Sequence, residues 1–288
     1  MALLLLRIRQ SPCQPSSPHL WDVPLRTRAW GAIVLAACGI APTTTLGQGP
    51  PGSNLSVDVR VSSVRLEGDT ARVEYVLFNR SSSIEKLVSF TVDAPAPPIQ
   101  LHSPGSPREW DVGSIFWDRT VASWAALATI PQGAKSPQLW FRALGLPTIV
   151  TGWYQGDALP TLGEDDPEND PEKEPVAHDA LEHGSIRVET IGVEPLPSPV
   201  TDQRLTMRLH RLTDRSCTLG WISDATLCYK LRGHLSAEPW FEAQPVRLAA
   251  FLRELIAGHA SGGLVSDNAY WLLKTNAEYI QAMAPRKR

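Results

Sequence analysis

The sequence lacks the short motifs that identify many common enzymes. It contains no GxSxG nucleophile turn, no Walker A loop, no GxGxxG that follows a strand and no HExxH zinc motif. Serine, histidine and aspartate are present, but nothing in their spacing unites them as a catalytic triad. Paired catalytic carboxylates come together only in the folded chain and leave no motif, so a hydrolase of unrecognised type stays one hypothesis.

The chain also lacks a strong charge of either sign and a long hydrophobic run. Its 27 basic and 30 acidic residues give a net charge of -3, which provides no basic surface and argues against nucleic acid as a partner. No apolar run reaches the roughly 20 residues that a bilayer-spanning helix needs. At 288 residues and 43% hydrophobic content, the chain is long enough for one large or two ordinary domains.

The longest apolar run lies near the N-terminus, between Arg28 and Pro42. Arg26 and Arg28 precede the run, and small or hydroxylated residues follow it. This layout is typical of a secretory signal peptide, here over about residues 26–47. Residues 1–50 are therefore expected to be a leader that is disordered when it is not cleaved.

Two forms of processing fit this leader. Cleavage after Gly47 would release a soluble secreted protein, whereas LAACG matches a bacterial lipobox in which Cys38 would be lipidated and become the new N-terminus. That lipid anchor is the one membrane attachment the sequence predicts. Translation from Val23 or Leu25 would give the signal a conventional length. Either form places the mature protein outside the cytoplasm of a bacterium: secreted, periplasmic or on the outer surface.

The sequence holds only four cysteines, and export determines which of them remain in the mature protein and whether they can form a disulfide. Cys13 leaves with the leader, and Cys38 is either lost or lipidated, so Cys217 and Cys228 remain as a pair. Export makes a disulfide permissible, and closing a loop of this size would stabilise the fold by roughly 3 kcal/mol. A metal site built on these cysteines lacks both CxxC spacing and further ligands nearby.

From Leu55 onward the hydrophobic period is close to 2, which predicts β-strands. The alternation from Leu55 to Val61 resumes after Ser62-Ser63, which predicts a β-bulge, and Glu67-Gly68-Asp69 predicts a hairpin turn. Further strands are expected over residues 71–77, 87–92, 99–101, 113–117, 138–143, 149–154 and 185–193. Short strands between Pro-, Gly- and Ser-rich turns indicate an antiparallel β-sandwich over residues 51–195, Ig-like or jelly-roll-like.

Two stretches resemble a loosely defined group of secreted bacterial β-sandwich domains. They read GDTARVEYVLFNRSSSIEKLVSF and IPQGAKSPQLWFRALGLP, with a Trp-containing loop between them. The resemblance covers roughly residues 55–158. It implies a structural domain and transfers no catalytic residues.

Ten tryptophans are also present, and five of them lie close together in the β-half. Aromatic rings of this kind pack the core of a sandwich, or, where they are exposed, form a stacking platform for sugars. The two interpretations stay open. The members of this ligand platform would be Trp110, Trp117, Trp124, Trp140 and Trp153.

An acidic, proline-rich loop is expected over residues 160–184, with the run GEDDPENDPEKEP at its centre. Repulsion between the carboxylates and the fixed backbone of the prolines favour an extended, solvated segment. Asp165, Asp166 and Asp170 are weak candidates for calcium ligands, but the spacing of an EF-hand is absent. His178 and His183 do not have zinc-site spacing, so no metal and no cofactor is expected.

From Ser198 the hydrophobic period changes to about 3.6, which predicts four amphipathic helices within residues 196–288. Ser223 is expected to cap the second helix, Pro245 to begin the third, and Ser266 with Asp267 to cap the fourth. The segments CTLGWISDATLCYKL, VRLAAFLRELIAG and VSDNAYWLLKTNAEYI resemble the FIMAH-type helical module of secreted bacterial proteins. This resemblance implies a non-catalytic accessory role.

Together these patterns predict an α+β protein with segregated parts: a β-sandwich followed by a small, disulfide-linked helical bundle. The expected function is that of an exported cell-envelope or secreted protein with a structural or interaction role and no enzymatic activity. A carbohydrate-binding surface module and an unrecognised secreted hydrolase are the alternatives. The expected partner is an envelope protein or a glycan.

Overall fold

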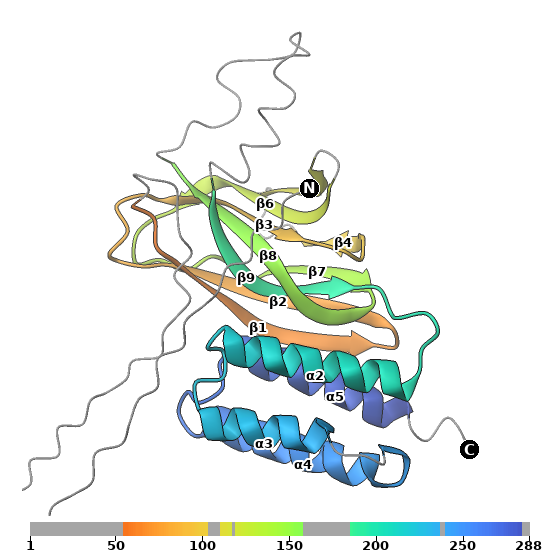
Figure 1. The fold of residues 1–288 in the computed structure, drawn as a ribbon. Helices are drawn as coiled ribbons and strands as arrows, with labels where there is room; N and C mark the ends of the chain where they lie inside the picture. Colours follow the sequence, from red (N-terminus) through yellow and green to blue (C-terminus); the bar gives the residue numbers. More distant parts are fainter. Residues whose placement is uncertain (1–53, 103–109, 117–118, 158–184, 237–239, 284–288) are drawn as a thin grey trace, which may run out of the picture. The chain divides into compact units, whose positions relative to one another are not determined.

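The computed structural model describes residues 54–102, 110–116, 119–157, 185–236 and 240–283. These residues form two antiparallel sheets followed by four helices, so the expected α+β class is confirmed (Figure 1). The leader expected over residues 1–50, with Cys38, lies outside the described residues. So do the acidic loop 160–184 and its calcium candidates Asp165, Asp166 and Asp170.

The described strands fall into a four-stranded and a five-stranded sheet. The first has the order β1-β2-β7-β4 and the second β5-β6-β3-β8-β9, with every pairing antiparallel. The strands are β1 (Val57–Glu67), β2 (Thr70–Asn79), β3 (Leu87–Asp93), β4 (Pro98–Leu101), β5 (Trp110–Phe116), β6 (Arg119–Ile130), β7 (Leu139–Leu144), β8 (Leu146–Gly156) and β9 (Ile186–Glu194).

The hairpin and the bulge expected near the start of the first sheet are both confirmed. Glu67 pairs with Thr70, so Gly68 and Asp69 make a two-residue turn, in which Gly68 has φ +64°. The register of β1 against β2 shifts between Val61 and Ser63. The sequence interpretation missed β6, because small alanines occupy positions where a strand usually carries β-branched side chains.

The inner faces of the two sheets share one aromatic core around Tyr75 of β2. Its ring meets Phe90 of β3 edge to face at 5.4 Å and Trp124 of β6 at 6.0 Å, and it stacks on Phe141 of β7 at 6.3 Å. The Tyr75 hydroxyl donates a hydrogen bond to the carbonyl of Ile191 in β9. Complete burial raises the pKa of Tyr75 well above its ordinary value. This one side chain therefore joins the two sheets.

The four described helices are α2 (Asp202–Thr218), α3 (Ala225–Ser236), α4 (Trp240–Ala260) and α5 (Asp267–Met283). Ser266 caps α5 as expected, since its hydroxyl oxygen accepts from the Ala269 amide at 3.3 Å. The cap of α3 is a correction: Asp224, not Ser223, accepts from the first amides of the helix, at 2.6 and 2.9 Å. The start of α4 is a second correction, because the helix begins before Pro245 and retains that proline.

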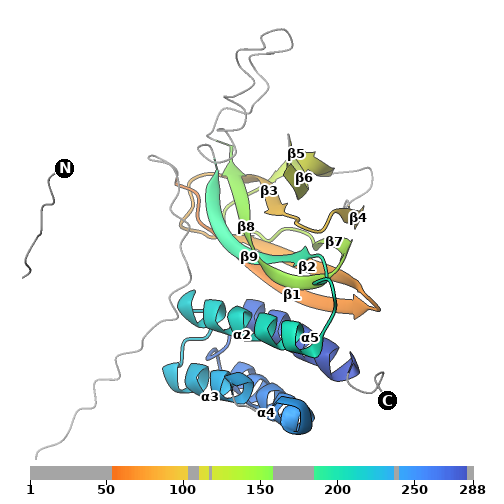
Figure 2. The ribbon, with the colours of Figure 1, turned by 45° about the vertical axis from the view of Figure 1, so that its right-hand side comes forward.

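Pro245 lies past the first turn of α4, where it lacks the N–H of one intrahelical hydrogen bond and its ring crowds the carbonyl four residues before. The helix continues through it because the later turns are held by buried side chains, among them Leu248, Phe251 and Leu255. The helices form two layers beside the sheets (Figure 1 and Figure 2). α5 packs against β1, and α2 lies beside β8 and β9, where Arg208 and Arg215 make its contacts. α3 and α4 lie on the far side of α2 and α5. Buried residues of sheets and helices belong to one continuous hydrophobic cluster, within one compact unit.

Candidate functional site

A groove of about 360 Å³ opens where the sheets meet the helical loops. One wall is the first half of β1, Val57–Arg60, and the floor includes Tyr154 of β8. The other walls come from β9, through Val188 and Glu189, and from the loops between helices, which contribute Gly220, Trp221, Gly263 and residues 265–268. We call this site the β1 groove. Its volume lies within the range of ordinary ligand pockets, roughly 300–1,000 Å³.

The backbone of β1 presents unpaired polar groups to this groove. Among the described strands β1 pairs with β2 alone, so no described strand pairs with its other edge. The Arg80 amide donates to the Ser56 carbonyl at 2.9 Å, and hydrogen-bonded and non-bonded residues alternate along an antiparallel pair. Val57, Val59 and Val61 therefore direct their N–H and C=O groups away from β2, and Val57 and Val59 lie in the lining of the groove.

Two side chains cap this edge, one at each end of the stretch from Val57 to Val61, in which the side chains of Val59 and Val61 point into the core and are buried. The Asn268 side-chain oxygen, at the start of α5, accepts from the Val61 amide at 3.0 Å. The Tyr154 hydroxyl hydrogen-bonds the backbone of Val57. Burial raises the pKa of Tyr154, while that hydrogen bond and the charge of Arg80 oppose the shift. Between the caps, Val59 has no hydrogen-bond partner for its outward N–H among the described residues.

The charged side chains that line the β1 groove already have partners in the chain. Asp58 binds Arg60 at 2.7 Å, and Glu189 binds Arg215 at 3.2 Å. Asp267 meets the Nε2 atom of His259 at 2.9 Å. Because these side chains are paired, the main-chain N–H and C=O groups of β1 are the polar groups of the groove with the fewest partners.

The His259–Asp267 pair resembles the base and the acid of a catalytic triad, which also needs a nucleophile within hydrogen-bond reach of the histidine. The Ser266 hydroxyl caps α5, and the Ser223 hydroxyl faces the carbonyls of Gly263 and Leu264 at 3.5 Å. In the part of the chain that the structure describes, no hydroxyl or thiol hydrogen-bonds His259, whose ring instead stacks on Tyr270 at 4.0 Å. A nucleophile next to its base is therefore not assembled there.

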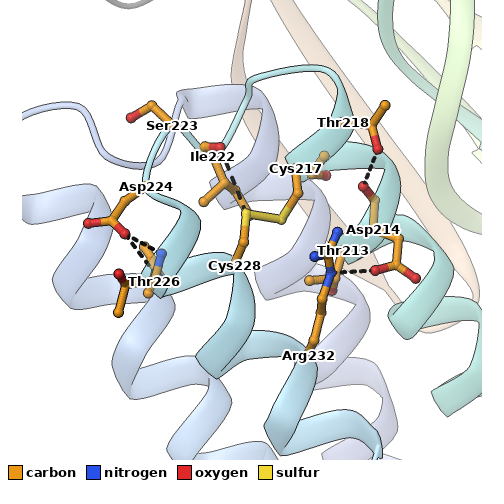
Figure 3. The surroundings of a disulfide bond; sticks show 12 residues. Thr213, Asp214, Cys217, Thr218, Ile222, Ser223, Asp224, Thr226, Cys228 and Arg232 are labelled. Carbon is orange, nitrogen blue, oxygen red and sulfur yellow. Dashed lines mark hydrogen bonds and ion pairs between the residues drawn. A yellow bond between two sulfur atoms is a disulfide. The ribbon is translucent and has the colours of Figure 1, made fainter. Parts of the chain in front are cut away.

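The predicted disulfide joins the helices that frame one wall of the groove. Cys217 near the end of α2 is bonded to Cys228 of α3, with the two Cα atoms 6.1 Å apart (Figure 3). The same two helices are linked by Arg232 and Asp214 at 2.6 Å. The loop that the disulfide closes carries Trp221, whose carbonyl accepts from the Ser266 amide at 2.8 Å.

Arg208 of α2 fixes the helices against the sheets. Only 5% of Arg208 is exposed, and its guanidinium forms an ion pair with Glu194 at the end of β9. It also donates to the carbonyls of Leu146 and Pro147 at 3.2 and 2.7 Å, and to Asn276 of α5 at 3.1 Å. Burial, with a contribution from nearby Arg211, lowers the pKa of Arg208 to about 10.

The tryptophans do not form the row of exposed rings that a sugar platform needs. Trp110, Trp124 and Trp153 are 3%, 0% and 4% exposed, so their rings are packing material, which corrects the platform hypothesis for these three. Trp117 lies outside the described residues.

Trp140, on β7, is half-buried, but its ring already has two stacking partners. The Arg72 guanidinium lies 4.1 Å from its centroid, and the ring of His102 stacks on it at 4.9 Å. Arg72 comes from β2 and His102 from the end of β4, the strands on either side of β7. The Trp140 ring is therefore already engaged by two side chains of the chain itself, which does not suit a free stacking surface for a sugar.

No family model matches the chain, and no curated protein matches it. An uncharacterised protein from Nocardia farcinica with an immunoglobulin-like fold shares 11% identity, with 48% of this chain and 97% of that chain covered, at a TM-score of 0.28. A likeness that weak carries no argument. The resemblance of the helices to a FIMAH-type module has no family match behind it.

The described residues contain no group of three or more His, Cys, Asp or Glu side chains that could hold a metal ion. None of the described helices is long and apolar enough to cross a membrane. The sequence interpretation did not identify the β1 groove or Arg208. Alternating valines predicted the strand but gave no sign that it lies at an edge.

Proposed function

We propose that this protein is exported, is not an enzyme, and binds a partner in the β1 groove. The observation that carries the proposal is the Cys217–Cys228 disulfide, which closes the loop that supplies Trp221 to the groove. Disulfides persist in oxidising compartments outside the cytoplasm. A covalent link at this place supports both export and a role for the groove whose wall it stabilises.

Three further features support the proposal. The signal-like run over about residues 26–47 agrees with export. The first half resembles secreted bacterial β-sandwich domains, which implies a structural role, and the second resembles a FIMAH-type module, which implies a non-catalytic accessory role. The groove offers paired charges and an open strand edge, which suit recognition better than bond cleavage.

Fractionation of a bacterial host that expresses the full chain tests the proposal. Protein from each fraction is treated with a thiol-reactive polyethylene glycol before and after reduction, which adds mass to every free cysteine. We expect a shortened chain outside the cytoplasm, labelled at Cys217 and Cys228 only after reduction. The Cys217→Ser variant is the control, because it leaves Cys228 free to react. A full-length cytoplasmic chain with both thiols reactive would contradict the proposal.

A further inference from the structure

We propose that the open edge of β1 at Val59 binds an extended segment of another protein by strand addition. This inference rests on the proposed function, in which the β1 groove is the interaction site. Strand addition uses the main-chain groups of an exposed sheet edge, while the side chains of the incoming segment occupy neighbouring pockets. The β1 groove supplies both components, an edge and a pocket.

The edge has the right chemistry over a short, defined length. The register places the N–H and C=O of Val59 and the C=O of Val57 on the groove side of β1. Tyr154 and Asn268 occupy the amides of Val57 and Val61, so they limit the pairing to the residues between. At about 3.3 Å per residue, this window spans roughly 13 Å and accepts about three residues of a partner strand.

The surroundings favour a peptide backbone over a charged ligand. Asp58, Glu189 and Asp267 are each paired with a basic side chain of the same chain. A ligand that relied on its own charge would have to displace one of these pairs. A peptide strand satisfies the unpaired main-chain groups and leaves the ion pairs intact.

The lining of the groove also includes apolar side chains, which a side chain of the peptide can contact. Val57 and Val188 are partly buried hydrophobics at the margin of the core, and Trp221 is 7% exposed in the lining. A volume of about 360 Å³ accommodates a short stretch of chain with one or two side chains. The expected ligand is therefore an extended, largely uncharged segment of about three residues within a longer chain.

The experiment screens a phage-displayed library of random dodecapeptides against the oxidised full chain. An enriched peptide is resynthesised with one N-methyl group at each position in turn, and its Kd is measured by fluorescence anisotropy. We expect N-methylation to weaken binding about tenfold or more at alternate positions and to leave it nearly unchanged between them, because only every second amide faces β1. Hydrogen exchange should show new protection of the Val59 amide on binding.

Matched variants isolate the backbone donor. Val59→Ala and Val59→Pro both remove the isopropyl group, but only the proline removes the N–H, which lies outside the β1–β2 ladder. We expect the proline variant to bind about tenfold more weakly than the alanine variant. The N-methyl scan uses the unaltered protein, so it decides the question even if the proline variant does not fold.

Three results would overturn strand addition: no enriched peptide, no alternation in the N-methyl scan, or binding that leaves the Val59 amide unprotected. A glycan or a second copy of this chain as the occupant of the groove would do so as well. These outcomes leave export untouched, because the fractionation and thiol labelling report on export alone. The failure of the inference and the failure of the proposed function are therefore distinguishable.

Discussion

Replacing Arg208 with methionine should weaken the contacts that hold the helices against the sheets and so lower the stability of the protein. Methionine fills much of the volume but removes every donor that the guanidinium provides. Leu146 then loses the donor at its carbonyl, and the Asn276 side-chain oxygen loses its partner, whereas Pro147 keeps the Asn276 amide at 3.0 Å. A buried acceptor without a partner costs about 1–3 kcal/mol.

The ion pair adds to this loss. Breaking a buried ion pair typically costs roughly 3–5 kcal/mol, but the Glu194 side chain is 36% exposed and can regain water, which limits the cost here. We therefore expect Arg208→Met to lower the free energy of unfolding by about 3 kcal/mol. Urea unfolding followed by tryptophan fluorescence measures this, with buried rings in the sheets and Trp221 in the helical loop as reporters.

Arg215→Met is the matched control. Arg215 lies on the same helix and pairs with Glu189 of β9, but its side chain is 51% exposed. Exposed ion pairs contribute about 0–1 kcal/mol, so this variant should remain close to the parent. Equal losses for the two variants, or a loss below about 1 kcal/mol for Arg208→Met, would refute the view that Arg208 fastens the helices to the sheets.

Three further predictions concern stability. Replacing Cys217 and Cys228 with serine should lower the free energy of unfolding by about 3 kcal/mol, by a urea titration without reductant; an unchanged midpoint would contradict it. Tyr75→Phe should cost about 1–2 kcal/mol by calorimetry, because a buried β9 carbonyl loses its donor. Burial, then the charge of Arg72, lowers the pKa of His102, so the folded state resists protonation there. Stability should fall as pH drops below about 6.5, and less so in His102→Gln; identical pH profiles would exclude His102 as the cause.

Local patterns predicted the elements of this fold well. Alternation from Leu55 to Val61, the glycine turn at Gly68 and the serine bulge are all properties of neighbouring residues, and the structure has them. The same is true of the Ser266 cap and the Cys217–Cys228 pair. What failed was also local: the alanines of β6 resemble neither a buried strand nor an amphipathic helix.

The candidate site depends on contacts that no local pattern contains. Asn268 caps Val61 across 207 positions of the sequence, and Arg208 reaches Pro147 across 61. The clustered tryptophans suggested a ligand platform only because proximity in sequence says nothing about the inward or outward face of a sheet. Trp124 and Trp140 lie on adjacent parts of the chain, yet one is fully buried and the other carries Arg72 on its ring.

The caps on β1 bear on solubility as well as on recognition. An uncapped edge strand can template the addition of like chains, which is the first step of fibre growth. By occupying the amides of Val57 and Val61, Tyr154 and Asn268 leave a gap too short for the eleven residues of another β1 to pair along their length. The arrangement discourages self-polymerisation while a brief foreign segment can still dock, so loss of Asn268 should bring aggregation before it brings unfolding.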